Sequence, residues 1–119
     1  MASEISTRSL RGMQEEVVAW CHRKGWYDKP LSFGEAMTEL HSEVSEAWEA
    51  WRRWGAGDAT GPAVEPGLVC KPEGVGSEFA DVLIRLLDYC DRFGVDLEAE
   101  YARKMEYNET RGYRHGMRN

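Results

Sequence analysis

Residues 32–54 read SFGEAMTELHSEVSEAWEAWRRW, which joins a helix-start signal, an apolar stripe and a row of acids. Ser32 and Glu35 have the spacing of a capping box, in which the serine accepts a backbone hydrogen bond and the glutamate reaches back. Apolar residues then recur at steps of three and four, the period of an amphipathic helix. Glycine at position 55 suits the helix end. The apolar positions are Ala36, Met37, Leu40, Val44, Ala47, Trp48 and Trp51.

Three more helices are predicted around this one. The first spans about residues 7–24, the third runs from a cap at Ser77 to Phe93, and the fourth spans about 97–108 behind a cap at Asp96. Between the second and third, residues 55–76 contain six glycines and three prolines, which predicts a long loop. No strand pattern competes, so we expect an all-α fold, most simply an antiparallel four-helix bundle. In the third helix the positions expected to face inward are Phe79, Val82, Leu83, Leu86, Leu87 and Cys90.

Length and charge restrict the class of protein. A chain of 119 residues fits one domain, 1–119, with its core at about 7–111 and a basic tail at 112–119. The formal net charge of 15 − 21 = −6 argues against a stable nucleic-acid partner, because such partners reward basic surface. We expect no membrane span and no signal peptide, hence a cytoplasmic protein. Three widely spaced cysteines indicate neither a disulfide framework nor a zinc site.

Carboxylates form the most informative pattern. Glu39, Glu43 and Glu46 lie within about 60° of one another on the second helix, since a helix turns about 100° per residue. Glu78 and Asp81 repeat the one-turn spacing on the third helix. If the two faces meet, four carboxylates converge, and partly buried carboxylates need a compensating cation.

Oxygen-only ligands suit a hard cation, so we expect Mg²⁺, with Mn²⁺ as an alternative. Such ions hold phosphates and activate water, which predicts metal-assisted phosphate hydrolysis. The alternative is a solvated acidic helix face without a ligand. A di-iron bundle would need Glu-x-x-His pairs, and neither His41 nor His115 has that spacing.

The C-terminal segment is basic and offers phosphate-binding candidates. Lys104, Asn108 and Arg111 share one face of a continued helix, and a lysine, an amide and a guanidinium suit a polyphosphate. A basic last turn could instead complement the helix dipole. The tyrosines at 101, 107 and 113 leave RNA binding as a weaker alternative.

Tryptophans offer candidates for stacking a nucleobase. Trp20, Trp26 and Trp48 could each lie within a turn or two of the acidic face. The spacing does not choose among them, and all three could instead be core or subunit-interface anchors.

Together these motifs resemble the MazG-like family of all-α nucleoside triphosphate pyrophosphohydrolases. The resemblance covers roughly residues 30–116. It is carried by Ser42-Glu43-Val44-Ser45-Glu46, by Glu78-Phe79-Ala80-Asp81, by Lys71-Pro-Glu-Gly74, and by Lys104-Met-Glu-Tyr-Asn108-Glu-Thr-Arg111.

The resemblance implies cleavage of a nucleoside triphosphate between its α and β phosphates, giving a monophosphate and pyrophosphate. It implies that Mg²⁺ is held by Glu43, Glu46, Glu78 and Asp81, and that Lys104 and Asn108 lie near the phosphates. It also implies a homodimer or homotetramer with sites near subunit contacts.

Two departures from the family pattern bear on activity. Ser42 stands where the family has the first glutamate of E-E-x-x-E, so Glu39, one turn before Glu43, is the candidate to orient the attacking water. The gap from Glu46 to Glu78 is longer than in compact members, and the loop within it could be a lid or an insertion. A non-catalytic helical module that binds a nucleotide or a protein is therefore the alternative function.

Overall fold

The computed structural model describes residues 8–55 and 72–116, and within these ranges the chain is entirely helical, with no strand. The all-α prediction is therefore confirmed for the part described. Most of the predicted loop, with Lys71, lies outside the described residues, as do residues 1–7 and 117–119. The α-helices are α2 (Leu10–Arg23), α3 (Phe33–Trp54), α4 (Val75–Arg92) and α5 (Leu97–Glu109), and the short 3₁₀ helices are η1 (Trp26–Asp28) and η3 (Tyr113–Gly116).

The helix caps follow local chemistry in most places. Ser32 and Glu35 form the predicted capping box at the start of α3, and Asp96 accepts the backbone N–H of Ala99 at the start of α5. The predicted cap at Ser77 is wrong. α4 begins three residues earlier than predicted, after its cap Gly74, whose φ of 114° suits only glycine. The Ser77 hydroxyl donates instead to the carbonyl of Pro72 at 3.2 Å.

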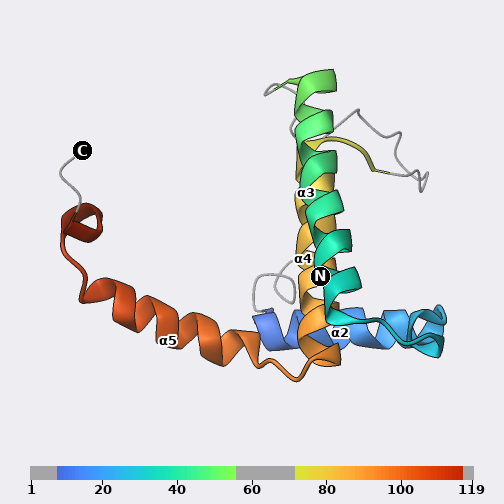
Figure 1. Cartoon of the computed structure of the whole chain (residues 1–119), viewed down its shortest axis with the longest axis horizontal. Coiled ribbons are helices and arrows are strands. Elements are labelled where there is room, and N and C mark those ends of the chain that lie inside the picture. The colour runs from blue at the N-terminus through green and yellow to red at the C-terminus, as the bar shows by residue number, and fades with distance from the viewer. Residues whose placement is uncertain (1–7, 56–71, 117–119) are drawn as a thin grey trace.

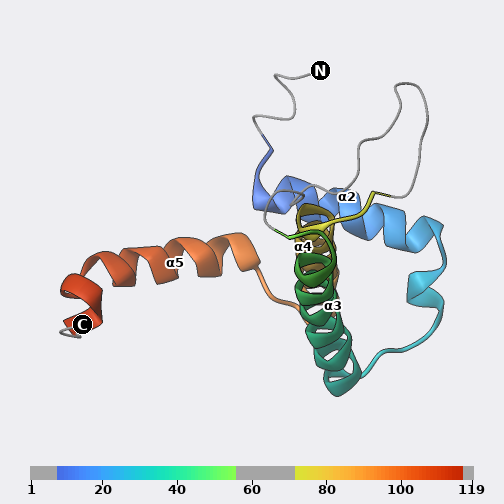
Figure 2. The same cartoon turned by 90° about the horizontal axis from the view of Figure 1, so that it is seen from above.

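An antiparallel pair made by α3 and α4 forms the body of the molecule, and α2 crosses this pair at a steep angle (Figures 1 and 2). The buried residues come from all three helices. Leu87 of α4 is only 1% exposed, and the small side chains of Cys21 in α2 and Ala36 in α3 are also buried. Alanines at 47 and 50 also face inward, which lets α3 and α4 approach closely.

Helix α5 leaves this body instead of packing along it (Figures 1 and 2). Gly94, with a φ of 70°, forms the turn, and α5 then contacts the start of α2. The contact is charged: Arg11 of α2 pairs with Asp96 and with Glu98, each at 3.0 Å. In the described residues the expected bundle is thus three packed helices with a fourth extending from them.

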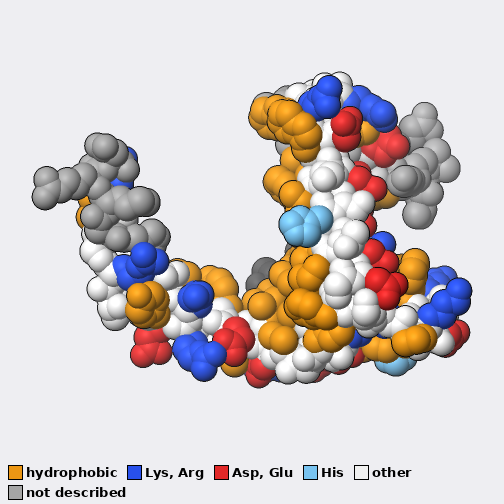
Figure 3. All heavy atoms as spheres, in the orientation of Figure 1, with side chains coloured by type: hydrophobic (Ala, Val, Ile, Leu, Met, Phe, Trp, Pro, Cys, Tyr) orange, Lys and Arg blue, Asp and Glu red, His pale blue; other side chains and the backbone are white. Residues whose placement is uncertain are grey.

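Several large apolar side chains that we expected to face inward are exposed. Trp48 is 60% exposed and Phe79 is 61% exposed, and Val44, Trp51 and Leu83 are also exposed. Hydrophobic side chains gather along the side of the α3–α4 pair that is turned toward α5, and acidic ones along the opposite side (Figure 3). One partner helix cannot cover the whole predicted apolar stripe. The remainder is exposed because α5 does not pack over it.

Among the described helices, none combines the length and apolar character that a bilayer crossing requires.

Candidate metal centre

Three glutamates converge where α3 and α4 lie side by side. Glu43 and Glu46 come from α3 and Glu78 from α4, and one carboxylate oxygen of each lies within 4.8 Å of the others. The one-turn spacing puts Glu43 and Glu46 on the same face of α3, and the antiparallel neighbour brings Glu78 against that face. The structure therefore brings together three of the four carboxylates predicted to hold a metal.

Asp81, the fourth predicted ligand, stands one turn after Glu78 on α4. Its charge acts on both Glu46 and Glu78, and its side chain lines a cavity together with Glu43. Its negative charge therefore belongs to the same electrostatic environment as the three glutamates.

The cluster shows the effects of crowded negative charge. Burial, followed by the charges of Asp81, Glu46 and Glu43, raises the pKa of Glu78. Hydrogen bonding with Glu43, then burial and the neighbouring charges, raises the pKa of Glu46. Both shifts mean that the folded chain disfavours the fully ionised cluster when no cation is present.

Two oxygens of this cluster remain without a hydrogen bond. Glu43 Oε2 and Glu78 Oε2 are buried, and neither has a partner in the described part of the chain. Such carboxylate oxygens are costly unless a cation or a donor satisfies them. The donor set, carboxylate oxygens alone, fits a hard divalent cation such as Mg²⁺.

Glu39 does not join the cluster. Its Oε2 accepts a hydrogen bond from the Tyr89 hydroxyl and another from Arg85 Nη1 at 3.5 Å. Burial and the bond to Glu39 raise the pKa of Tyr89, so that this hydroxyl stays protonated as a donor. Glu39 is therefore fixed beside the cluster, one turn from Glu43.

Arg85 is one of the residues of this site that the sequence analysis missed. Its Nε donates to Glu43 Oε1 at 3.2 Å, so one guanidinium joins Glu39 to Glu43. A signal was available, because Arg85 follows Glu78 by seven residues and Asp81 by four, on the same face of α4.

A cavity of about 330 Å³ adjoins the cluster and contains two of the three candidate tryptophans. Trp20 of α2 and Trp26 of η1 line it, together with Glu43, Asp81 and Asp88. Trp48 is not among the lining residues and lies exposed on α3. The guanidinium of Arg85 lies 5.6 Å from the centre of the Trp26 ring, which joins the cavity to the acidic cluster.

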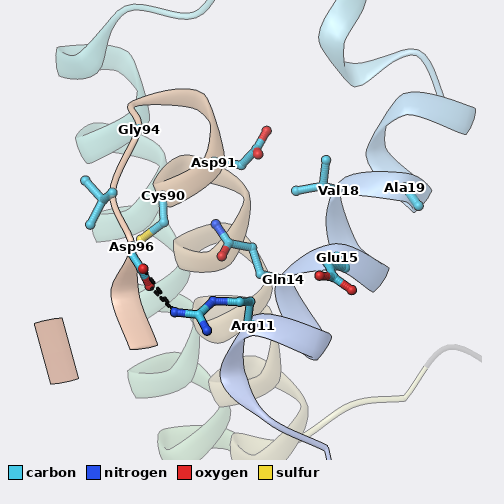
Figure 4. Close-up of a pocket in the computed structure, with 10 residues that line it drawn as sticks. Arg11, Gln14, Glu15, Val18, Ala19, Cys90, Asp91, Gly94 and Asp96 are labelled. Carbon is cyan, nitrogen blue, oxygen red and sulfur yellow. Dashed lines mark hydrogen bonds and ion pairs between the residues drawn. The ribbon is translucent and has the colours of Figure 1, made fainter. Parts of the chain in front are cut away.

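A wider, open cleft of about 610 Å³ lies elsewhere, between α2 and the turn that connects α4 to α5 (Figure 4). It contains none of the cluster carboxylates, and its Arg11 is already paired with Asp96 across the opening (Figure 4). Of these two cavities, the smaller one is lined by predicted metal ligands, Glu43 and Asp81, and the wider one is not.

The three candidate phosphate ligands are not near the cluster within one chain. Lys104 and Asn108 are on α5 and Arg111 follows it, and α5 points away from α3 and α4 (Figures 1 and 2). Locally, the Asn108 amide contacts Met105 Sδ at 3.9 Å and the Arg111 guanidinium lies 5.8 Å from the Tyr107 ring centre.

Comparison with protein-family models, with curated proteins and with solved structures gives no significant match.

The raised pKa values predict how stability depends on pH. The folded chain binds protons on Glu46 and Glu78 more tightly than the unfolded chain does. Without metal, their contribution to the free energy of unfolding should therefore fall as the pH rises from about 4.5, the ordinary glutamate value, through the raised values.

Urea unfolding at several pH values, in EDTA and in Mg²⁺, measures this dependence. At pH values above this range, Mg²⁺ should restore the free energy of unfolding. Glu78→Gln should weaken the pH dependence measured in EDTA. Identical EDTA and Mg²⁺ curves would contradict a cation site at these glutamates.

Proposed function

We propose that this protein is a Mg²⁺-dependent nucleotide pyrophosphohydrolase, a cytoplasmic enzyme that cleaves a nucleoside triphosphate between its α and β phosphates. The observation that carries the proposal is the cluster of Glu43, Glu46 and Glu78 beside a cavity lined by two tryptophans, with two buried oxygens that no described residue bonds to. A cation-binding site beside an aromatic cavity suits a ligand that carries both a polyphosphate and an aromatic ring.

Glu43, Glu46, Glu78 and Asp81 would hold Mg²⁺, with Mn²⁺ as an alternative. The ion would supply charge stabilisation for the phosphates and a water of lowered pKa. Glu39, fixed by Tyr89 and Arg85, is suited to orient a water one turn from Glu43, in the role that Ser42 cannot fill. Trp20 and Trp26 would stack the base.

The phosphate-binding role of Lys104, Asn108 and Arg111 requires a second copy of the chain in this proposal. Because α5 extends from the body, these residues would reach the cluster of a partner in a homodimer or homotetramer. The exposed apolar side of α3 and α4, including Trp48 and Phe79, supports such an association.

A non-catalytic nucleotide- or protein-binding module is the second candidate. It is favoured by the ion pair between Arg85 and Glu43, because a guanidinium already compensates one of the carboxylates. Ser42 in the motif also favours it.

A screen of canonical and modified nucleoside triphosphates separates the two candidates. With Mg²⁺ or Mn²⁺ the enzyme should release pyrophosphate and monophosphate in equal amounts, and EDTA should abolish the release. A nucleotide at 100 times its dissociation constant should also stabilise the fold by ~2.7 kcal/mol in thermal melting. Stabilisation without pyrophosphate would favour the binding module, and release of inorganic phosphate alone would contradict α–β cleavage.

A further inference from the structure

Asp88 is a buried carboxylate that neither the predicted metal site nor the proposed mechanism uses. Its side chain is 7% exposed and lies on α4, seven residues beyond Asp81. It lines the 330 Å³ cavity that holds Trp20 and Trp26, and also an adjoining cavity of about 490 Å³. It therefore lies where the two cavities meet.

Only one of its two oxygens is satisfied. Arg92 Nε donates to Asp88 Oδ2 at 3.3 Å, whereas Oδ1 is buried without a hydrogen bond to any residue that the structure describes. A buried acceptor left unpaired is costly, and a ligand that donates to it recovers that cost.

Of the neighbouring donors, Tyr27 and the two arginines already have other partners, and the Cys21 thiol beside Asp88 is only a weak donor. The Tyr27 hydroxyl has one hydrogen, which it donates to Asp91 Oδ2 at 2.8 Å, and Arg92 Nη2 donates to the carbonyl of Trp26 at 2.7 Å. Burial and the nearby carboxylates raise the pKa of Tyr27, and burial with the charge of Asp88 raises that of the Cys21 thiol. Both groups therefore stay neutral, and Arg85 is engaged by Glu39 and Glu43.

The charge balance around Asp88 indicates what kind of group can donate a hydrogen bond to its Oδ1. Arg92 already neutralises Asp88, so a cation at Oδ1 would leave an excess of buried positive charge. A neutral N–H group satisfies the oxygen without that cost. An ionised carboxylate accepts hydrogen bonds and donates none, so the ligand must supply the hydrogen.

We propose that Asp88 selects a nucleotide whose base carries an exocyclic amine, by accepting that amine at Oδ1 while the base lies against Trp20 and Trp26. This assignment rests on the proposed nucleotide-binding function of the same cavity. Seven residues along α4 separate Asp88 from Asp81 by about 10 Å, comparable with the span from the α-phosphate to the far edge of a base.

The amine is favoured over a ring imide for an electrostatic reason. The imide N–H of uracil is flanked on both sides by carbonyl oxygens, and a buried carboxylate repels both. An exocyclic amine projects beyond the ring, and in cytosine it has the ring acceptor N3 on one side and a C–H group on the other. Adenine also presents a projecting amine, with N1 and N7 to either side. In uracil and hypoxanthine a carbonyl oxygen, which a carboxylate repels, replaces the amine of cytosine and of adenine.

Nucleoside monophosphates test the assignment without any hydrolysis. Calorimetric titration in Mg²⁺ should give dCMP at least tenfold tighter binding than dUMP, or dAMP at least tenfold tighter than dIMP, according to which ring size the cavity takes. Asp88→Asn should remove or reverse that preference, because its amide can turn a donor toward a keto oxygen. Asp91→Asn, a change at the exposed neighbouring carboxylate, should leave the preference intact.

Equal binding of the amino and keto partners, a preference for the keto base, or no binding of any of the four would overturn the assignment. The wild-type comparison alone decides the matter if Asp88→Asn does not fold. An amine preference without pyrophosphate release from triphosphates would retain the inference and refute the proposed catalysis. Pyrophosphate release with equal kcat/KM for dCTP and dUTP, and for dATP and dITP, would refute the inference and retain the catalysis.

Discussion

Glu43→Gln is expected to lower Mg²⁺-dependent pyrophosphate release by about 10³-fold or more, equivalent to ~4 kcal/mol of lost transition-state stabilisation. The substitution removes the charge of the carboxylate that contributes to the acidic cluster, lines the cavity and bonds to Arg85. The amide oxygen of glutamine can still accept from Arg85, so the fold should be retained. A coupled pyrophosphate assay gives the rate, and circular dichroism checks the helical content.

Glu49→Gln is the matched control, because it makes the same change on α3 at an exposed position outside the cluster, paired with Arg52. It should retain full activity. Glu46→Gln, Glu78→Gln and Asp81→Asn should lose activity as Glu43→Gln does. Full activity in any two of the four cluster variants would refute the assignment of the metal site.

Arg85→Gln is expected to have opposite effects on metal binding and on turnover. The guanidinium competes with a cation for Glu43, so its removal should tighten Mg²⁺ binding at least tenfold in the absence of nucleotide. Turnover should nevertheless fall about 10- to 100-fold, because Glu39 and Glu43 lose the side chain that orients them. Calorimetric titration with Mg²⁺ measures the effect on metal binding, and single-turnover kinetics measures the effect on turnover.

Arg52→Gln provides the control, since Arg52 is an exposed arginine whose partner, Glu49, lies outside the cluster. Neither metal affinity nor turnover should change in that variant. Weaker Mg²⁺ binding in Arg85→Gln would show that Arg85 supports the cation site instead of competing with it.

Local signals in the sequence predicted the helices well. The capping box at Ser32 and the aspartate cap at Asp96 use hydrogen bonds to residues three positions along the chain, so spacing alone identifies them. The start of α4 was missed because Gly74 acts through its backbone conformation, whereas Ser77 only has the appearance of a cap.

The predicted inward faces were less accurate. Spacing defines an apolar stripe but not the number of helices that cover it. Trp48 and Phe79 belong to the predicted stripes and are exposed, because α5 turns away at Gly94. The direction of a helix after such a turn depends on long-range contacts that periodicity does not contain.

For the site, the one-turn pairs of acids on consecutive helices predicted the convergence of Glu43, Glu46 and Glu78. The same reasoning could not separate Glu39 from them, because its partners Tyr89 and Arg85 lie about 50 residues further along the chain. Asp88 was missed for a related reason: an unpaired buried oxygen is a property of packing and has no signature in residue spacing.

The charged attachment of α5 has a consequence for experimental conditions. Arg11 and Asp96 are exposed and Glu98 is partly exposed, and dissolved ions screen such charge pairs over about 8 Å at 0.15 M ionic strength. The orientation of α5, and with it the reach of Lys104 and Asn108, should therefore vary with salt. Magnesium nucleotides add to the ionic strength as they are titrated, so affinities measured without a constant background electrolyte would combine ligand binding with movement of this helix.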